Sequence, residues 1–369
     1  MAITILNTEY SGEVLEQILT KAALNNEMVN EGLIHVEPGI QKSWALPMLT
    51  ATRLLQKRVE MPTSANVKGD VNYEEKTLNP VDFMAYTEFN PRTFESIWRP
   101  YQPKGNLVFR ELNPETQLKL VQALVDKVSE ELGENYINGR FSATGLMNGI
   151  VSRMLACEGV HFVQGGQTTY AAKLKAVFSA IPKTIRKKPS LKFIMNMDDA
   201  DDYDYELKEN VYKNADLTQA QSLAYNGIPI VSLANWPKGL IVCTLASTGY
   251  DGQFYAAVDY NNDEEIFQID KVSNAGEKYF FKMLMKADTN VAFGDYIVVL
   301  DERAAETNYV TEYSGTATSI ATNGVLLGAT YRYTNSGTSA VTVSTGVESP
   351  VEIAGKDTYV FHFNGTSWF

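Results

Sequence analysis

Apolar side chains are spaced first for helix, then for strand, then for helix again along the first third of the chain. Residues 11–28 hold them three and four positions apart, which predicts a short amphipathic helix on an otherwise irregular arm of residues 1–50. Residues 113–139 repeat this spacing over a greater length, and Pro114 suits the first turn of a helix after an Asn113 N-cap. We therefore expect one long helix there, with an apolar face made of Leu118, Val121, Val125, Val128 and Leu132.

Residues 51–112, between these two helices, have the pattern of extended chain. Apolar and polar side chains alternate from 83 to 89, which is the period of a strand. A polar, turn-rich tip at 62–76 separates this stretch from an earlier extended one, so we expect a long hairpin with arms at 52–61 and 77–90. Because a two-stranded ribbon cannot bury both faces by itself, such a hairpin needs another surface to lie on.

Residues 155–264 mix helical and strand patterns, which predicts a compact α/β lobe. A helix is expected over 168–182, and the short apolar run LKFIMNM that starts at Leu191 has the length of a buried strand. Two further apolar strands follow, with turns at Asn226-Gly227 and Pro237-Lys238-Gly239.

The last third of the chain changes composition near Arg303. Residues 265–302 return to strands, and we expect them to form a sheet against the long helix, so that 113–154 and 265–302 make one domain. Residues 303–369 carry little charge and are rich in Thr, Ser, Gly and Asn, with short strands between turns. They predict a small, separate module resembling a β-sandwich. The fold class expected for the whole chain is α+β.

Composition limits what this chain can do. Its 369 residues are 44% hydrophobic, which is enough for a real core, and its formal charge of −12 argues against a protein whose main task is to hold phosphates. The same charge suits a wall that surrounds nucleic acid without binding to it. No apolar run is long enough to span a membrane, and the N-terminus lacks a secretory pattern, so we expect synthesis in a cytoplasm.

The stretch FIMNMDDADDYDYELKE, residues 193–209, is the strongest candidate for chemistry. Five aspartates follow the predicted strand directly and lead into a helix. Asn196 or Asp198 can cap that helix, and acids in a first turn complement the helix dipole. A metal site would need ligands with defined spacing or carboxylates from separate elements, and we expect helix capping instead. Changing Asp198, Asp199, Asp201 and Asp202 to Asn tests the remaining alternative, an acid-dependent hydrolase.

Other candidate groups have no arrangement typical of an enzyme. His35, His161 and His362 share no metal-ligand spacing, and Cys157 and Cys243 lie in apolar segments where a thiol packs as a small hydrophobe. The common hydrolase, zinc-protease, P-loop and EF-hand patterns are absent from the sequence. We therefore expect no catalytic, cofactor-binding or metal-ligating residue, no cofactor and no enzymatic activity.

One basic cluster remains to be explained, between the predicted helix and the apolar run. It is made of Lys183, Arg186, Lys187 and Lys188. A solvated turn accounts for it, and contact with an acidic neighbour or with nucleic acid are the alternatives.

The order of these parts resembles a known family. An arm, an extended hairpin, a long helix after Asn113-Pro114, a lobe containing FSAIPKTIRKKPSLKFIMNMDDADDY and YNGIPIVSL, and a closing β layer are similar to the major capsid protein of tailed double-stranded-DNA bacteriophages, with the HK97-like fold. The resemblance covers residues 1–302 and depends on segment order more than on an invariant motif. It implies an extended loop at 51–112, a spine helix at 113–139, a peripheral domain at 113–154 and 265–302, and an axial domain at 155–264.

The resemblance also implies a function and partners. Copies would assemble into hexamers and pentamers of an icosahedral virion shell that encloses double-stranded DNA without reading its sequence, after synthesis in a bacterial cytoplasm and without a membrane partner. A separate scaffolding protein, an uncleaved subunit, a portal, and decoration or head-tail proteins are expected. Some relatives join subunits through a Lys-to-Asn isopeptide bond, for which Lys68 and Lys76 are the candidates here.

Two alternatives of other kinds stay open. An encapsulin-like nanocompartment shares the fold, and enzyme cargo in place of DNA would distinguish it. A surface glycan-binding protein is suggested by aromatic residues of the last module, including Trp368, and binding of glycans by a monomer would favour it.

Overall fold

The architecture described here comes from a computed structural model of the chain. It describes residues 8–9, 26–51, 55–61, 63–64, 67–90, 114–142, 145–163, 165–209, 223–259, 267–272, 278–303, 310–314, 318–320, 322, 325 and 327–369. Within these ranges, every helix is too short or too polar to cross a membrane.

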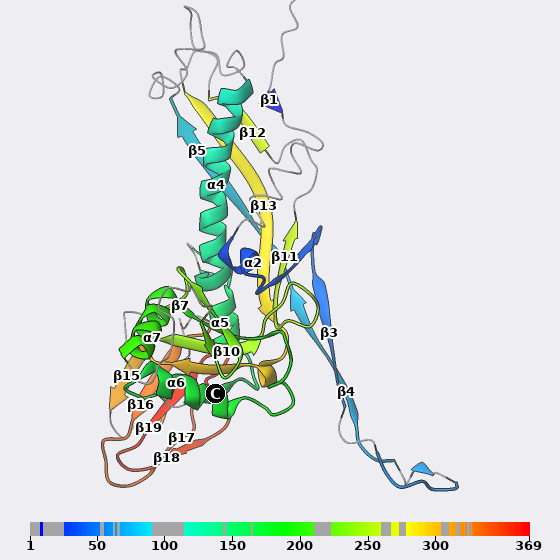
Figure 1. The fold of residues 1–369 in the computed structure, drawn as a ribbon, viewed down its shortest axis with the longest axis vertical. Helices are drawn as coiled ribbons and strands as arrows, with labels where there is room; N and C mark the ends of the chain where they lie inside the picture. The colour runs from blue at the N-terminus through cyan, green and yellow to red at the C-terminus, as the bar shows by residue number, and fades with distance from the viewer. Residues whose placement is uncertain are drawn as a thin grey trace, which may run out of the picture.

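A long strand, β13 (Tyr279–Val291), organises the first of two six-stranded sheets (Figure 1). β5 (Val81–Phe89) pairs antiparallel along one edge of β13, while β11 (Phe254–Asp259) and β12 (Phe267–Lys271) pair one after the other along its opposite edge. β2 (His35–Pro38) and β1 (Thr8–Glu9) pair with β11 and β12 at the margin. We call these strands, with the helices packed on them, the sheet lobe.

The long helix α4 (Pro114–Asn138) crosses one face of this sheet and confirms the predicted helix. Its 25 residues correspond to a rod of about 38 Å. Val121, Val125 and Leu132 are buried in the same cluster as the inward side chains of β13, whereas Asn113 and the side chain of Leu118 lie outside the described residues. The alternation in β13 is that of a strand with one covered face.

The second sheet forms the α/β lobe and has the strand order β6-β14-β10-β7-β9-β8. Its helices α6 (Tyr170–Ala180) and α7 (Met197–Glu209) cover one face. The turn predicted at Asn226-Gly227 is present, with both residues at positive φ between β8 and β9. The strands are β6 (His161–Val163), β7 (Leu191–Asn196), β8 (Ala224–Tyr225), β9 (Ile228–Leu233), β10 (Leu240–Leu245) and β14 (Val298–Asp301).

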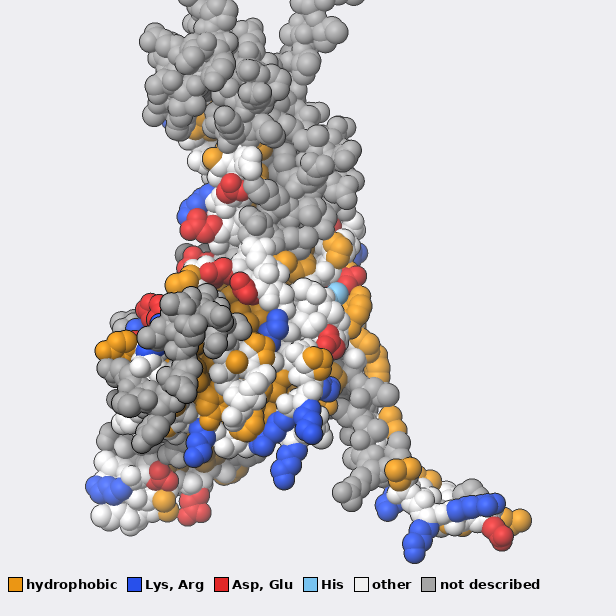
Figure 2. All heavy atoms as spheres, viewed as in Figure 1, with side chains coloured by type: hydrophobic (Ala, Val, Ile, Leu, Met, Phe, Trp, Pro, Cys, Tyr) orange, Lys and Arg blue, Asp and Glu red, His pale blue; other side chains and the backbone are white. Residues whose placement is uncertain are grey.

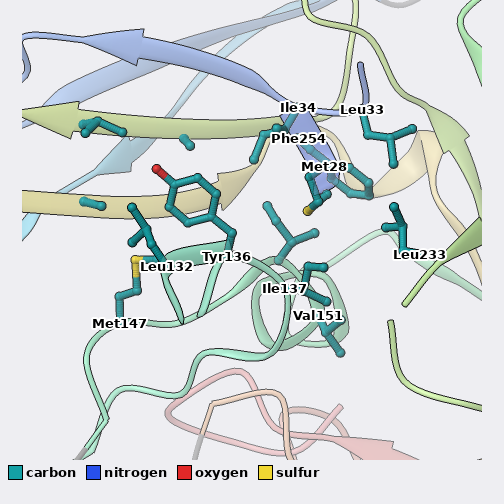
Figure 3. Packing of buried hydrophobic residues seen from close by; sticks show 14 of the residues in the cluster. Met28, Leu33, Ile34, Leu132, Tyr136, Ile137, Met147, Val151, Leu233 and Phe254 are labelled. Atoms are coloured by element: carbon teal, nitrogen blue, oxygen red, sulfur yellow. The ribbon is translucent and has the colours of Figure 1, made fainter. Parts of the chain in front are cut away.

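A continuous core joins the two lobes. β10 is buried on both faces, so Cys243 packs toward α6 and α7 while Val242 packs toward α4. Around the end of α4, side chains of the short helices α2 (Glu27–Asn30) and α5 (Ile150–Leu155) meet both sheets in one cluster (Figure 3). Figure 3 labels Met28, Leu33, Ile34, Leu132, Tyr136, Ile137, Met147, Val151, Leu233 and Phe254 in this cluster.

The extended hairpin exists, but its predicted arms are wrong. Its strands are β3 (Trp44–Ala51) and β4 (Val71–Leu78), paired antiparallel over their whole lengths, and Figure 1 shows them leaving the body as a thin ribbon. The alternating segment 83–89, expected as the second arm, is β5 of the sheet lobe, where its alternation reflects burial against the core. β3 contains Pro47, and proline is tolerated in a strand only at an edge. The sequence pattern of these residues is therefore a weak signal for a strand.

Strand pairing also corrects three predicted domain limits. β11, expected in the axial part, pairs with β13 in the sheet lobe, and β14, expected in the peripheral part, pairs with β10 in the α/β lobe. β2, expected in the N-terminal arm, is a strand of the sheet lobe. The chain thus crosses between the sheets after β10 and again after β13, and the strands on both sides of each crossing are equally apolar, so hydrophobicity alone does not show which sheet a strand joins. The amphipathic helix predicted at 11–28 lies largely outside the described residues.

The described residues from 310 onward form a small β module with its own core. One sheet has the order β15-β16-β19 and a second pairs β17 with β18, as predicted for short strands between turns. The strands are β15 (Val310–Ser314), β16 (Thr330–Thr334), β17 (Val341–Val343), β18 (Val351–Ile353) and β19 (Thr358–His362).

These parts confirm the α+β fold class and the order of segments expected from the sequence. A long helix lies on a sheet, an extended hairpin leaves that sheet, and an α/β lobe is inserted between its strands.

Candidate assembly interface

The aspartate stretch is structural. Asn196 accepts a hydrogen bond from the Asp198 backbone N–H at 2.8 Å, so it caps α7 as predicted. Asp199 is 1% exposed and accepts from the Gly239 N–H and the Tyr170 hydroxyl, which joins α7 to α6 and to the turn before β10. Among the described residues, no group of three or more His, Cys, Asp or Glu side chains could hold a metal ion.

Carboxylates of this stretch also bind the first residues of α6 and the Tyr170 hydroxyl. Glu206 accepts from the backbone N–H groups of Tyr170 and Ala171, at the positive end of α6. Burial, followed by the hydrogen bond to Asp199, raises the pKa of the Tyr170 hydroxyl, so it stays a proton donor to these carboxylates at neutral pH.

The histidines and cysteines belong to separate parts of the molecule. His35 is on β2 of the sheet lobe, His161 is on the edge strand β6, and His362 is buried at the end of β19. Cys157 and Cys243 are both buried and unpaired by any disulfide, as expected. Burial raises the pKa of the Cys243 thiol, which keeps it neutral. The structure therefore brings none of the sequence's candidate residues together into a reaction centre within the described chain.

The unusual surface is the hairpin. Of the described large apolar side chains that are exposed, Leu55 (92%), Met61 (84%) and Val67 (74%) lie along its tip, and Val71 and Tyr73 follow on β4. Figure 2 shows orange side chains along the ribbon, with basic ones beside them at the tip. An apolar ribbon held away from the body is typical of a surface that a partner covers.

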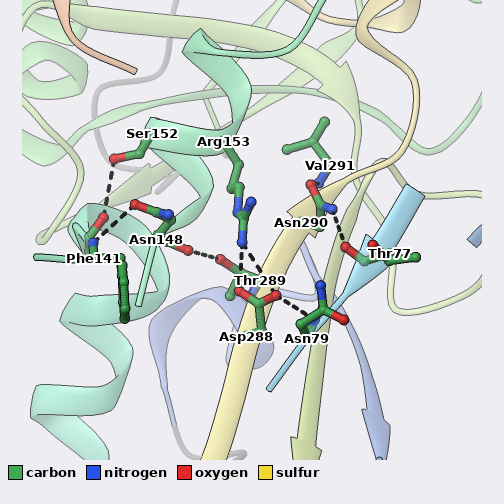
Figure 4. Close-up of polar contacts among 11 residues, drawn as sticks. Thr77, Asn79, Phe141, Asn148, Ser152, Arg153, Asp288, Thr289, Asn290 and Val291 are labelled. Carbon is green, nitrogen blue, oxygen red and sulfur yellow. Dashed lines mark hydrogen bonds and ion pairs between the residues drawn. The ribbon is translucent and has the colours of Figure 1, made fainter. Parts of the chain in front are cut away.

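A buried polar network holds the base of the hairpin (Figure 4). Asp288 of β13, whose side chain is 2% exposed, receives hydrogen bonds from the Arg153 guanidinium at 3.0 Å and from the Asn79 N–H at 2.8 Å. Two residues further along β13, Asn290 donates from its side-chain amide to the Thr77 carbonyl at 2.9 Å. Burial raises the pKa of Asp288, and Arg153 opposes that shift.

An apolar contact holds the other side of the hairpin base. Leu46 of β3 and Leu78 of β4 are buried with Tyr255 and Ala257 of β11. Lys76 donates from Nζ to Cys157 Sγ at 2.7 Å, so this candidate for an isopeptide bond is engaged within its own chain, whereas Lys68 is exposed near the tip. The hairpin thus has a fixed base and an uncovered tip.

We expect Asp288→Ala to lower the free energy of unfolding by about 2 kcal/mol, because it leaves Arg153 and the Asn79 N–H without their buried acceptor. Urea titration of the purified chain measures this loss. The matched control is Asp82→Ala, which removes a carboxylate that is 80% exposed and pairs with Lys286 at 3.1 Å on the same sheet. A change of less than about 0.5 kcal/mol is expected for the control, and equal losses for both variants would contradict an anchoring role for Asp288.

This network was not predicted from the sequence. Arg153, Asp288 and Asn79 lie far apart along the chain, since Arg153 is on α5, Asp288 is on β13 and Asn79 directly follows β4. Alternation along β13 places Asp288 in phase with the outward-facing Lys282 and Lys286, so its burial breaks the pattern and could not be expected from it.

Comparison with known proteins gives structural matches only. No family model and no curated protein matches this chain. Solved structures of similar fold include the capsid of an empty GTA particle, with 11% identity over 82% of this chain and 94% of that chain and a TM-score of 0.49. A satellite phage P4 procapsid gives 11% identity over 79% and 99%, with a TM-score of 0.48.

A third match is the holo-SrpI encapsulin complex from Synechococcus elongatus, with 15% identity over 74% of this chain and 87% of that chain and a TM-score of 0.44. All three TM-scores are below 0.5. The inference of function therefore rests on the geometry of this chain.

Proposed function

We propose that this chain is the structural subunit of a protein shell, the major capsid protein of a phage head. Copies would associate into hexamers and pentamers of an icosahedral shell around double-stranded DNA. The observation that carries the proposal is the hairpin, which is fixed at its base by Asp288 and exposes apolar side chains at its tip.

Physical chemistry connects this geometry to assembly. A two-stranded ribbon is marginal in water, and exposing Leu55 or Met61 to solvent brings no benefit to a monomer. Both costs are removed when a second copy covers the ribbon. Permanent assemblies bury several thousand Å² per subunit, and a ribbon of this length supplies such area without enlarging the body.

The proposal includes partners and a place. The protein would be made in a bacterial cytoplasm, assembled with a separate scaffolding protein, joined to a portal and to decoration or head-tail proteins, and retained in the virion. The charge of −12 supports enclosure of DNA without tight binding to it. The chain would act by contact between copies and catalyse no reaction, since Asn196 caps α7 and the one buried aspartate of the stretch, Asp199, joins α7 to α6 and to the turn before β10.

Glycan binding through the last module finds less support. Trp368 is 3% exposed and Phe361 is fully buried, so these rings form the core of the β module and are not available to stack on a sugar.

Electron microscopy of the purified protein tests the proposal. We expect closed shells or their ring-shaped capsomers, and nuclease-protected double-stranded DNA in particles taken from the native source. Protein cargo in place of DNA would indicate the nanocompartment function instead. A monomer that persists at high concentration, with the hairpin protected from hydrogen exchange, would contradict both.

A further inference from the structure

The basic cluster before β7 forms a rigid turn. Arg186 donates from Nε to the Ile181 carbonyl and from Nη2 to the Ser179 carbonyl, both at 2.9 Å, and its guanidinium lies 5.0 Å from the Phe178 ring centroid. Ile185 is buried beneath it. We call residues 183–188 the basic turn. Its internal bonds hold the backbone in place, so its exposed lysines project from a fixed support.

Two lysines of the basic turn have no acidic partner among the residues that the structure describes. Lys183 and Lys187 are exposed, and neither forms an ion pair with any described residue. Arg186 is used internally, and Lys188 lies 5.6 Å from the Tyr296 ring centroid. The projecting charge of the turn is therefore that of Lys183 and Lys187.

The opposite kind of surface lies on α7. Met197, Asp201 and Tyr205 are spaced four residues apart on its exposed side, and Asp198 and Asp202 flank them. Met197 is 50% exposed and Tyr205 is 63% exposed. We call these five residues the acidic face. It combines exposed carboxylates with two large apolar side chains, a composition suited to a protein contact.

The two surfaces lie at opposite ends of α6. Asp202 of the acidic face accepts a hydrogen bond from the hydroxyl of Tyr170, the first residue of α6, whereas the basic turn lies just beyond the last residue of α6. The 11 residues of α6 separate them by about 16 Å. Figure 2 shows basic side chains gathered along the lower edge of the α/β lobe and acidic ones along its upper left side. The two surfaces therefore cannot neutralise each other within one copy.

We infer that the basic turn of one copy docks on the acidic face of the next copy, so that α/β lobes associate head to tail. This inference rests on the proposed shell function and assigns one of its contacts. Two different patches that pair in this way form a heterologous interface, which generates a ring when its rotation closes. Opposite charge also steers encounter and rejects a reversed orientation.

Charge reversal tests the inference. We expect Lys183→Glu with Lys187→Glu, and separately Asp198→Lys with Asp201→Lys, each to lower the assembled fraction at least about tenfold, since like charges then face each other at every contact. The chain that carries all four substitutions restores the attraction and should assemble within about twofold of the wild type. Glu348→Lys with Glu352→Lys, on exposed positions of the β module, is the matched control and should assemble normally.

Mixing the two reversed chains tests the direction of pairing. Each reversed basic turn fits only the reversed acidic face of the other variant, so the two chains must alternate around a ring. An alternating ring closes with an even number of copies and not with an odd number. We expect hexameric rings, and sheets or tubes made of them, without closed shells; closed shells like those of the wild type would overturn head-to-tail pairing.

Further outcomes separate this inference from its alternatives. If the wild type assembles and either reversed pair assembles equally well, the inference fails and the shell function stands; if the wild type forms no shell, the proposed function itself fails. Loss of bound nucleic acid from intact shells of the Lys183→Glu, Lys187→Glu chain would assign the basic turn to nucleic acid instead. If circular dichroism shows that a variant is misfolded, the salt dependence of the wild type tests the inference instead. Association of the wild type should weaken between about 0.05 M and about 0.5 M salt. Association that does not depend on salt would overturn the inference.

Discussion

A chain in which residues 52–70 are replaced by Asn-Gly should fold like the wild type and fail to form shells. Ala51 and Val71 are paired across the ribbon, so a two-residue turn can join β3 to β4 without disturbing the rest of the hairpin. The removed tip includes Leu55, Met61 and Val67, none of which contributes to a core of the monomer. The melting temperature should therefore change little while assembly is abolished.

Size-exclusion chromatography and electron microscopy measure the assembly, and a thermal scan measures the fold. A milder version, Leu55→Ser with Met61→Ser, should weaken assembly in the same direction. Its control is Tyr359→Ser with Val360→Ser, which removes exposed apolar side chains from the β module. Normal shells from the truncated chain would show that the tip covers no partner and would remove the main support for the proposed function.

Acid should destabilise the β module through His362. This residue is 4% exposed, its ring stacks on Phe162 of the α/β lobe with centroids 3.8 Å apart, and its Nδ1 has no hydrogen-bond partner within the described part of the chain. Burial lowers the pKa of His362 from 6.5 to about 4, with the nearby Asp301 opposing the shift and Arg303 adding to it. The folded module therefore holds the neutral ring, and protonation favours the unfolded module.

The direction of the pH effect follows from linkage. Stability is complete above the unfolded pKa of 6.5 and is lost as the pH falls toward the folded value of about 4. The loss at pH 4 is about 3 kcal/mol. Urea titration of tryptophan fluorescence, which includes the buried Trp368, at about pH 7 and about pH 4 measures it.

The control for this effect is His362→Phe, which keeps an aromatic ring against Phe162 and removes the titrating group. Acids distant from His362 titrate equally in both proteins. Asp301 interacts with His362, but its pKa stays below the ordinary value because the hydrogen bond and charge of Arg303 outweigh the effect of burial, so Asp301 remains ionised in the window in question. The difference between the two chains therefore isolates His362. An equal loss of stability in both chains on acidification would show that His362 is not the sensor.

The sequence predicted those elements whose pattern is local. The alternation in β13, the apolar face of α4 and the cap at Asn196 each depend on neighbours within a few residues, and all three are present in the structure. Partners of a strand are set by distant residues instead. The pattern at 83–89 showed that one face of β5 is covered, but it carried no information on whether β13 or β3 lies beside it.

The site was predictable only in outline. An uncovered ribbon could be expected from the polar tip and flanking strands, yet the residues that hold its base could not. Arg153, Asp288 and Asn79 meet because three distant segments come together at one point of the sheet. The periodicity of one sequence carries no information on such contacts. The α/β boundaries failed for a similar reason, since β11 and β14 are equally apolar strands that join different sheets.

The core that runs from α4 through β10 limits how a shell of such subunits can change its diameter. Turning one lobe against the other would open a close-packed interior that includes Tyr136, Trp236 and Phe254. The free-energy cost of opening this interior is far larger than the cost of sliding the hydrated surfaces of two neighbouring copies past each other. Expansion or contraction would therefore leave each body rigid and would be taken up by contacts between copies and by bending where the ribbon leaves Asn79.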